Sequence, residues 1–202
     1  GGVMIGEALG INSTLTELDL SFNLMDDDAG VKLADSLTVN SALTFLNLSC
    51  NFIGERGGVK LAEALALNSK LTSLNLDENQ IGEAGGVKFG QALAVNSTLT
   101  RLDLSFNEIG KGILKGLAVN STLTRLEVGD DDIDDWELMN DYLQRNIHNS
   151  QLKMGSLFHL LLPHAFSDEE DCGCISSSSS RKRESPSYGG SLLLEPPAKR
   201  HN

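Results

Sequence analysis

The sequence predicts an α/β fold: a right-handed solenoid in which short strands form one parallel sheet on the concave face and helices cover the convex side. Two observations carry this prediction. A leucine-rich motif returns five times along the chain, and an apolar helical segment follows each of the first four copies. A unit of one strand and one helix cannot bury its apolar face alone, so neighbouring units stack and share a core.

The strand segments come from the five copies of the motif. Their leading leucines are spaced by 28, 28, 28 and 24 residues and lie at Leu15, Leu43, Leu71, Leu99 and Leu123. Apolar residues follow three and five positions later, and this alternation is typical of a strand with one buried face. We expect strands near 15–20, 43–48, 71–76, 99–104 and 123–128.

An asparagine stands eight residues after the leading leucine in four copies, at Asn23, Asn51, Asn79 and Asn107, and Asp131 takes that position in the fifth. The pattern L-x-x-L-x-L-x-x-N resembles the leucine-rich repeat, in the ribonuclease-inhibitor-like subclass with repeats of about 28 residues. The match covers roughly residues 1–150. The resemblance implies a segment of an α/β horseshoe and a role as scaffold, inhibitor or sensing array.

The second half of each unit predicts a helix, for example at 57–68 and 85–96, where apolar residues recur four apart. We expect each helix to end at an asparagine in the left-handed conformation, at Asn40, Asn68, Asn96 and Asn120. The shortened unit at 109–120 contains Gly112 and Gly116, which predicts at most two helical turns and a thinner outer wall. The segment 1–13 aligns with the helix from Gly57 and is a partial first unit.

The repeats are expected to end in a capping helix over about 133–146, with Trp136, Met139, Tyr142 and Leu143 at helical spacing. The period vanishes after residue 150. Residues 151–202 contain a long stretch rich in Ser, Pro and charge, which predicts a mostly disordered tail. Basic clusters at 181–183 and 199–200 are consistent with nuclear import of a protein that is otherwise cytoplasmic.

The charge balance of the chain limits the kinds of partner that the protein can bind. The chain has 28 acidic and 16 basic side chains, a net charge of −12, which argues against nucleic acid and favours a basic protein partner. The excess lies in residues 1–150 and is densest at 130–141, where a basic partner or the protein's own basic tail would be steered. No apolar stretch is long enough to span a membrane. The three cysteines are too few for a disulfide framework and indicate a reducing compartment.

Nothing in the sequence indicates catalysis, a cofactor or a metal. The four histidines all lie beyond the repeats, no serine or cysteine belongs to a recognised catalytic motif, and the Gly-Gly pairs lack the flanking residues of a phosphate-binding loop. The sequence therefore predicts a non-enzymatic protein-interaction module.

The predicted binding face is the concave side of the sheet. The residues between the buried leucines point to that side, and they vary from one unit to the next while the leucines do not. They are Glu17, Asp19, Phe45, Asn47, Ser73, Asn75, Arg101, Asp103, Arg125 and Glu127. Among them Phe45 is the single aromatic residue, and we expect it to anchor the partner.

Two alternatives stay open. Ran GTPase-activating proteins resemble this repeat type, so the chain could regulate a small Ran-like GTPase, although it has about half the expected length and no long acidic tail. It could also be the C-terminal sensing array of a nucleotide-binding immune-type receptor. A phosphate-binding domain encoded upstream would favour the receptor.

Overall fold

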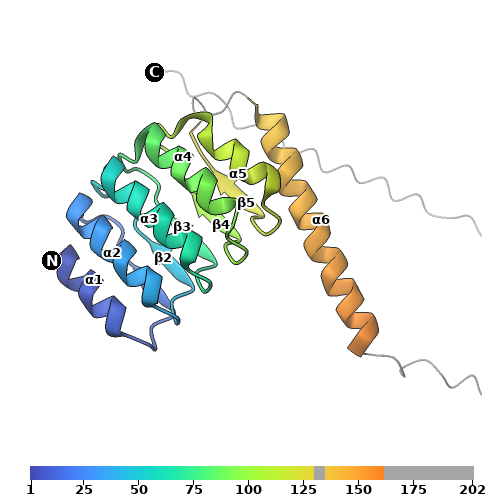
Figure 1. Ribbon diagram of the computed structural model, residues 1–202, viewed down its shortest axis with the longest axis horizontal. Coiled ribbons are helices and arrows are strands. Elements are labelled where there is room, and N and C mark those ends of the chain that lie inside the picture. The colour runs from blue at the N-terminus through green and yellow to red at the C-terminus, as the bar shows by residue number, and fades with distance from the viewer. Residues whose placement is uncertain (130–134, 162–202) are drawn as a thin grey trace, which may run out of the picture. The chain divides into compact units, whose positions relative to one another are not determined.

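The computed structural model describes residues 1–129 and 135–161, and within these ranges it forms the predicted solenoid. Five strands pair in parallel and in chain order, and the helices line one side of the sheet (Figure 1). The strands are β1 (Glu17–Asp19), β2 (Phe45–Asn47), β3 (Ser73–Asn75), β4 (Arg101–Asp103) and β5 (Arg125–Glu127). The helices are α1 (Gly2–Ile11), α2 (Asp27–Val39), α3 (Glu55–Leu67), α4 (Gly82–Leu93), η1 (Gly110–Ile113), α5 (Leu114–Val119) and α6 (Trp136–Leu161).

The strands are in register, repeat upon repeat. Each strand is three residues long, and its central leucine pairs with the central leucine of the next strand. The leading leucines of the second to fifth copies are fully buried, whereas Leu15 in the first copy is 39% exposed. Leu15 differs because, among the described residues, repeats stack on one side of it only.

The strand-exit asparagines connect each repeat to the one before it. The Nδ2 of Asn79 donates to the carbonyl oxygen of Leu48 at 3.0 Å, and its Oδ1 accepts from the backbone N–H of Ile53 at 3.0 Å. Asn51 and Asn107 make the equivalent pair of contacts. The column thus satisfies loop groups that stacking would otherwise leave buried and unpaired.

The asparagines at the helix ends do not adopt the predicted left-handed conformation. Asn40, Asn68 and Asn120 are extended, with φ between −65° and −73°. Asparagine is useful there because of its side chain: Asn68 accepts from two N–H groups of the next turn and donates to the Leu37 carbonyl oxygen at 2.7 Å in the previous repeat. The left-handed residues instead lie in the loops that lead from a strand to the next helix.

The shortened fourth unit has a shorter helical layer, as predicted, but it exceeds the two helical turns expected because a 3-10 turn precedes α5. Four residues of 3-10 helix and a six-residue α5 replace the 12 to 13 residues of α2, α3 and α4. Here glycine allows an unusually close approach: a Cβ on Gly116 would lie 1.7 Å from the carbonyl oxygen of Gly90 on α4. The backbones of α4 and α5 are therefore in direct contact at this point.

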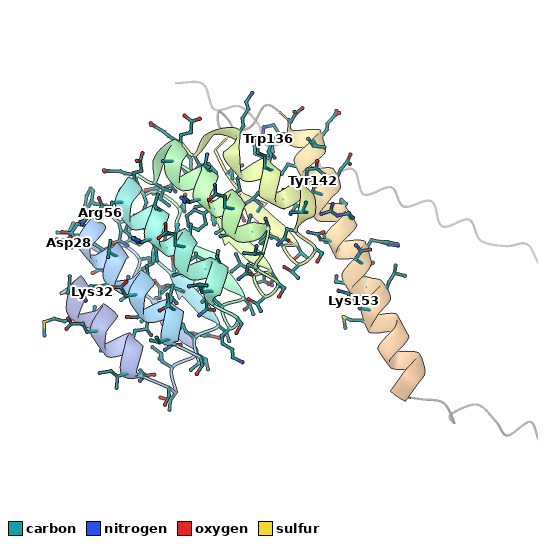
Figure 2. The ribbon with its side chains drawn as sticks, viewed as in Figure 1. Asp28, Lys32, Arg56, Trp136, Tyr142 and Lys153 are labelled. Atoms are coloured by element: carbon teal, nitrogen blue, oxygen red, sulfur yellow. The ribbon has the colours of Figure 1, made fainter. Side chains whose placement is uncertain are left out.

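Helix α6 closes the array, and it is longer than predicted. Met139 and Leu143 are buried in the shared core, and Tyr142 is partly buried. Trp136 does not belong to this buried face, because it lies at the first turn of α6 and is 39% exposed (Figure 2). The helix continues to Leu161, past the predicted end at 146 and the predicted domain boundary at 150.

Two side chains of α6 complete the hydrogen bonding of the last repeat. The guanidinium of Arg145 donates to the carbonyl oxygens of Leu117, Ala118 and Asn120 at the end of α5. Asn146 donates to the Leu123 carbonyl oxygen at 2.8 Å and to the Oδ1 of Asn120, the last of the helix-end asparagines, at 3.4 Å. Of the tail predicted to be disordered over 151–202, residues 151–161 form the end of α6, and residues 162–202 lie outside the described residues, as does the acidic run at 130–134.

Candidate functional site

The sheet arranges the ten predicted binding residues in two rows. Strand pairing places the first residues of the strands side by side as Glu17, Phe45, Ser73, Arg101 and Arg125. The last residues form the second row as Asp19, Asn47, Asn75, Asp103 and Glu127. Neighbouring members of a row are about 4.8 Å apart because that is the spacing of paired strands. All ten are exposed or partly exposed.

A groove of about 280 Å³ crosses β2 to β5 on this face. Seven of the ten predicted residues line it, while Glu17, Asp19 and Asn47 lie outside it. Leu74 and Leu102, the buried central leucines of β3 and β4, also contribute to its lining. The predicted residues therefore belong to one surface, and its hollowed part lies over the later repeats.

The groove is divided by charge. Arg101 and Arg125 stand opposite each other on β4 and β5, an arrangement that is unfavourable unless an anionic group lies nearby. Arg125 forms an ion pair with Glu127 at 2.6 Å between Nε and Oε1. Both side chains are largely exposed, so the pair contributes little to stability and leaves the arginines available to a partner.

Carboxylates gather at the strand-exit side of the same groove. Burial raises the pKa of Asp77, and the neighbouring charges of Asp103 and Glu78 raise it further. Its Oδ1 is buried and accepts no hydrogen bond from the described residues. In the first repeat, by contrast, hydrogen bonds from Ser21 lower the pKa of Asp19. The groove thus has two neighbouring arginines at one end and carboxylates along its strand-exit side.

A second group of exposed side chains, on the loops that follow the strands, was not among the predicted binding residues. Phe22, Leu24, Phe52 and Phe106 are 81%, 85%, 54% and 73% exposed. They lie beside the strand-exit asparagines, and a groove of about 440 Å³ runs between Phe52 and Phe106. The repeated Ser-Phe-Asn at 21–23 and 105–107 was the available signal, because phenylalanine there falls outside the alternating buried positions.

The described residues contain neither a candidate metal site nor a candidate membrane span. Within 1–129 and 135–161, no three His, Cys, Asp or Glu side chains are grouped so that they could hold a metal ion. In the same ranges, no helix combines the length and apolarity needed to cross a bilayer.

Repeats of one strand and one helical segment, stacked on a parallel sheet, define the leucine-rich-repeat class of proteins. A family model described as "Leucine Rich repeat" matches residues 12–34, 39–62, 67–90 and 95–118. The chain is a leucine-rich-repeat protein. Its place in the ribonuclease-inhibitor-like subclass stays a prediction based on the length of the repeat.

Solved structures show the same fold. A structure titled "Leiomodin-1 Actin-Binding Site 2 (ABS2)" matches with a TM-score of 0.70 and 22% identity, over 79% of this chain and 95% of that one. The tropomodulin C-terminal domain of Caenorhabditis elegans matches with a TM-score of 0.66 and 14% identity, over 76% of this chain and 98% of that one. No curated protein matches the sequence.

Proposed function

We propose that this protein is a non-enzymatic interaction module that binds a partner protein through the concave face of its repeats. The observation that carries the proposal is the pair of rows on the sheet. Variable aromatic, basic and acidic side chains stand on an in-register frame of buried leucines. A frame fixed in this way presents its side chains with little loss of entropy on binding.

The groove suggests how a partner would be held. Phe45 lines one end and is partly buried, so it can supply apolar contact area, and the arginine pair lines the other end. Aromatic and arginine side chains are enriched among the residues that dominate binding energy in protein interfaces. A carboxylate of the partner placed between Arg101 and Arg125 would also relieve the repulsion between them.

Actin is the first partner to test. The leiomodin-1 structure, which has the same fold, is described as an actin-binding site. At 22% identity that likeness speaks for the fold alone, so actin binding by this chain is a proposal. The other two functions, regulation of a small Ran-like GTPase and sensing within an immune-type receptor, stay predictions, and a stimulated GTP-hydrolysis assay tests the first of them.

The test compares two triple variants in an actin-binding assay. The first changes the concave face, as Phe45→Ala, Arg101→Ala and Arg125→Ala. The second removes the same kinds of side chain elsewhere, as Val95→Ala, Lys70→Ala and Lys115→Ala, at three exposed positions outside the groove. We expect the wild type and the second variant to bind alike and the first to bind at least tenfold more weakly.

Two results would contradict parts of the proposal. If the wild type does not bind actin, actin is not the partner, and the same variants are then compared on proteins cross-linked to the concave face. If the concave variant keeps wild-type affinity for each of the partners found, binding does not use this face.

A further inference from the structure

We propose that the loops after the strands form a second interaction surface, which binds a partner segment carrying both apolar and basic side chains. We call this surface the loop edge and define it by residues 21–28, 49–56, 77–84 and 105–112. None of these residues lines the concave groove, although Asp77 and Glu78 lie at its strand-exit margin, so this proposal does not depend on the one above. Three observations carry it: exposed phenylalanines, their backbone conformation and the local charge.

The apolar side chains of the loop edge do not serve the core. Phe22 and Phe106 are among the most exposed large hydrophobic residues of the described chain, and Leu24 and Phe52 stand near them in the neighbouring column. The groove between Phe52 and Phe106 has Glu78 and Gln80 in its lining. Contiguous exposed apolar groups rimmed by polar ones mark interaction sites on soluble proteins.

The backbone makes phenylalanine an unfavourable choice at these positions. Phe22 and Phe106 have φ of 54° and 53°, in the left-handed region where a bulky residue is strained. Cys50 and Glu78 adopt the same conformation in the repeats between them, so the turn belongs to the repeat and does not require an aromatic ring. The two phenylalanines therefore add contact area without helping the fold, a combination found at binding sites.

Charge selects the kind of partner. The loop edge contains eight acidic and two basic residues, and one of the bases, Arg56, is already paired with Asp28 at the starts of α2 and α3 (Figure 2). The opposite edge of the repeats runs from the last helical turn to the next strand and consists of residues 11–16, 39–44, 67–72, 95–100 and 119–124. It also exposes apolar residues, such as Val39 and Leu67, but Lys70 is its single charged residue. Electrostatic complementarity thus favours a basic partner at the loop edge only.

The spacing sets the length of the partner segment. Phe22 and Phe106 are three repeats apart, which corresponds to roughly 14 Å along the sheet at the spacing of paired strands. A helix covers that distance in about ten residues. A segment of this size would contact both phenylalanines and still reach Glu78, which lies between them in the column.

The experiment uses three fluorescent 18-residue peptides with one amphipathic pattern. The first contains leucine and lysine, the second replaces lysine with glutamate, and the third replaces leucine with serine. Binding is measured by anisotropy to the wild type, to Phe22→Asn with Phe106→Asn, and to Glu78→Gln with Glu108→Gln. Asparagine suits the left-handed conformation, so the first variant should unfold at a denaturant concentration no lower than the wild type.

We expect the leucine-lysine peptide to bind the wild type at least tenfold more tightly than either of the other two peptides. The phenylalanine variant should lose at least tenfold in affinity for it, and the glutamate variant should lose severalfold together with part of the salt dependence. The concave-face variant should bind it as the wild type does. Equal affinity of the wild type and the phenylalanine variant, or equal binding of the leucine-lysine and leucine-glutamate peptides, would overturn the proposal.

Discussion

Replacing Asn79 with alanine tests the column of strand-exit asparagines. Asn79 is buried, and its Nδ2 donates to the carbonyl oxygens of Leu48 and Leu76, each at 3.0 Å. Its Oδ1 accepts the backbone N–H of Ile53 in the preceding repeat. One side chain therefore satisfies groups of two repeats.

The expected loss in the free energy of unfolding depends on which backbone groups Asn79→Ala would leave without a hydrogen-bond partner. The two carbonyl oxygens keep a second donor, because Asn51 bonds to Leu48 and Asn107 bonds to Leu76. The N–H of the fully buried Ile53 loses its acceptor, and an unsatisfied buried donor costs about 1–3 kcal/mol. Loss of the Nδ2 bonds adds about 0.5–1.5 kcal/mol, so we expect Asn79→Ala to lower the free energy of unfolding by about 2–4 kcal/mol.

The assay is equilibrium unfolding in urea followed by far-UV circular dichroism, with Asn23→Ala as the matched control. Asn23 holds the same place in the first repeat, but it is exposed and donates within its own loop, to the carbonyl oxygens of Leu20 and Ser21. We expect the control to lose less than about 1 kcal/mol at an unchanged m-value. If both variants lose the same free energy, the bonds to the preceding repeat do not stabilise the array and the reasoning is wrong.

Three further predictions concern the end of the array and its charge. Gly116→Ala would place a methyl group against the carbonyl oxygen of Gly90, so we expect the free energy of unfolding, measured in urea, to fall by about 1–3 kcal/mol or more. If the variant is as stable as the wild type, α5 can move away from α4 and this reasoning is wrong. Arg145→Ala would leave carbonyl oxygens at the end of α5 without their donor, and amide exchange in α5 should accelerate while α2 is unaffected. The pKa of Asp77 is raised mainly by burial, so the folded state holds the proton of this carboxyl group more tightly than the unfolded state does. The free energy of unfolding therefore falls as pH rises from below the usual aspartate pKa to above the raised value. Asp77→Ser, which restores the residue found there in three other repeats, should stabilise the protein at neutral pH and give no gain below the usual aspartate pKa; a gain of equal size at both pH values would contradict this assignment.

The repeat architecture was predictable because the motif recurs along the sequence at a nearly constant spacing. Leucines three and five positions after each leading leucine define both the strand and its buried face, and a constant spacing puts equivalent residues of successive strands side by side. The ten concave residues follow from that register without any knowledge of tertiary contacts. The short helical layer near Gly116 was predictable for the same reason, since four residues are missing from the period.

The period of the sequence did not predict the side-chain contacts between repeats or at the ends of the array. The carbonyl oxygens to which Asn68 donates lie 28 and 31 residues earlier in the chain, so this role of its side chain and its extended backbone emerged only in the folded protein. The same holds for Arg145, which appears in the sequence as one more charged residue of a helix and in the structure as the donor at the end of α5.

The sequence by itself determined the fold class, the core and the face on which variable side chains stand, because these depend on local periodicity. Only the tertiary structure decided which apolar residues remain in water. Phe89 and Phe106 are the same residue type 17 residues apart, yet the first is fully buried and the second is largely exposed. Exposure depends on what packs against a side chain from elsewhere in the fold, and for this reason the loop edge became visible only when the repeats were stacked.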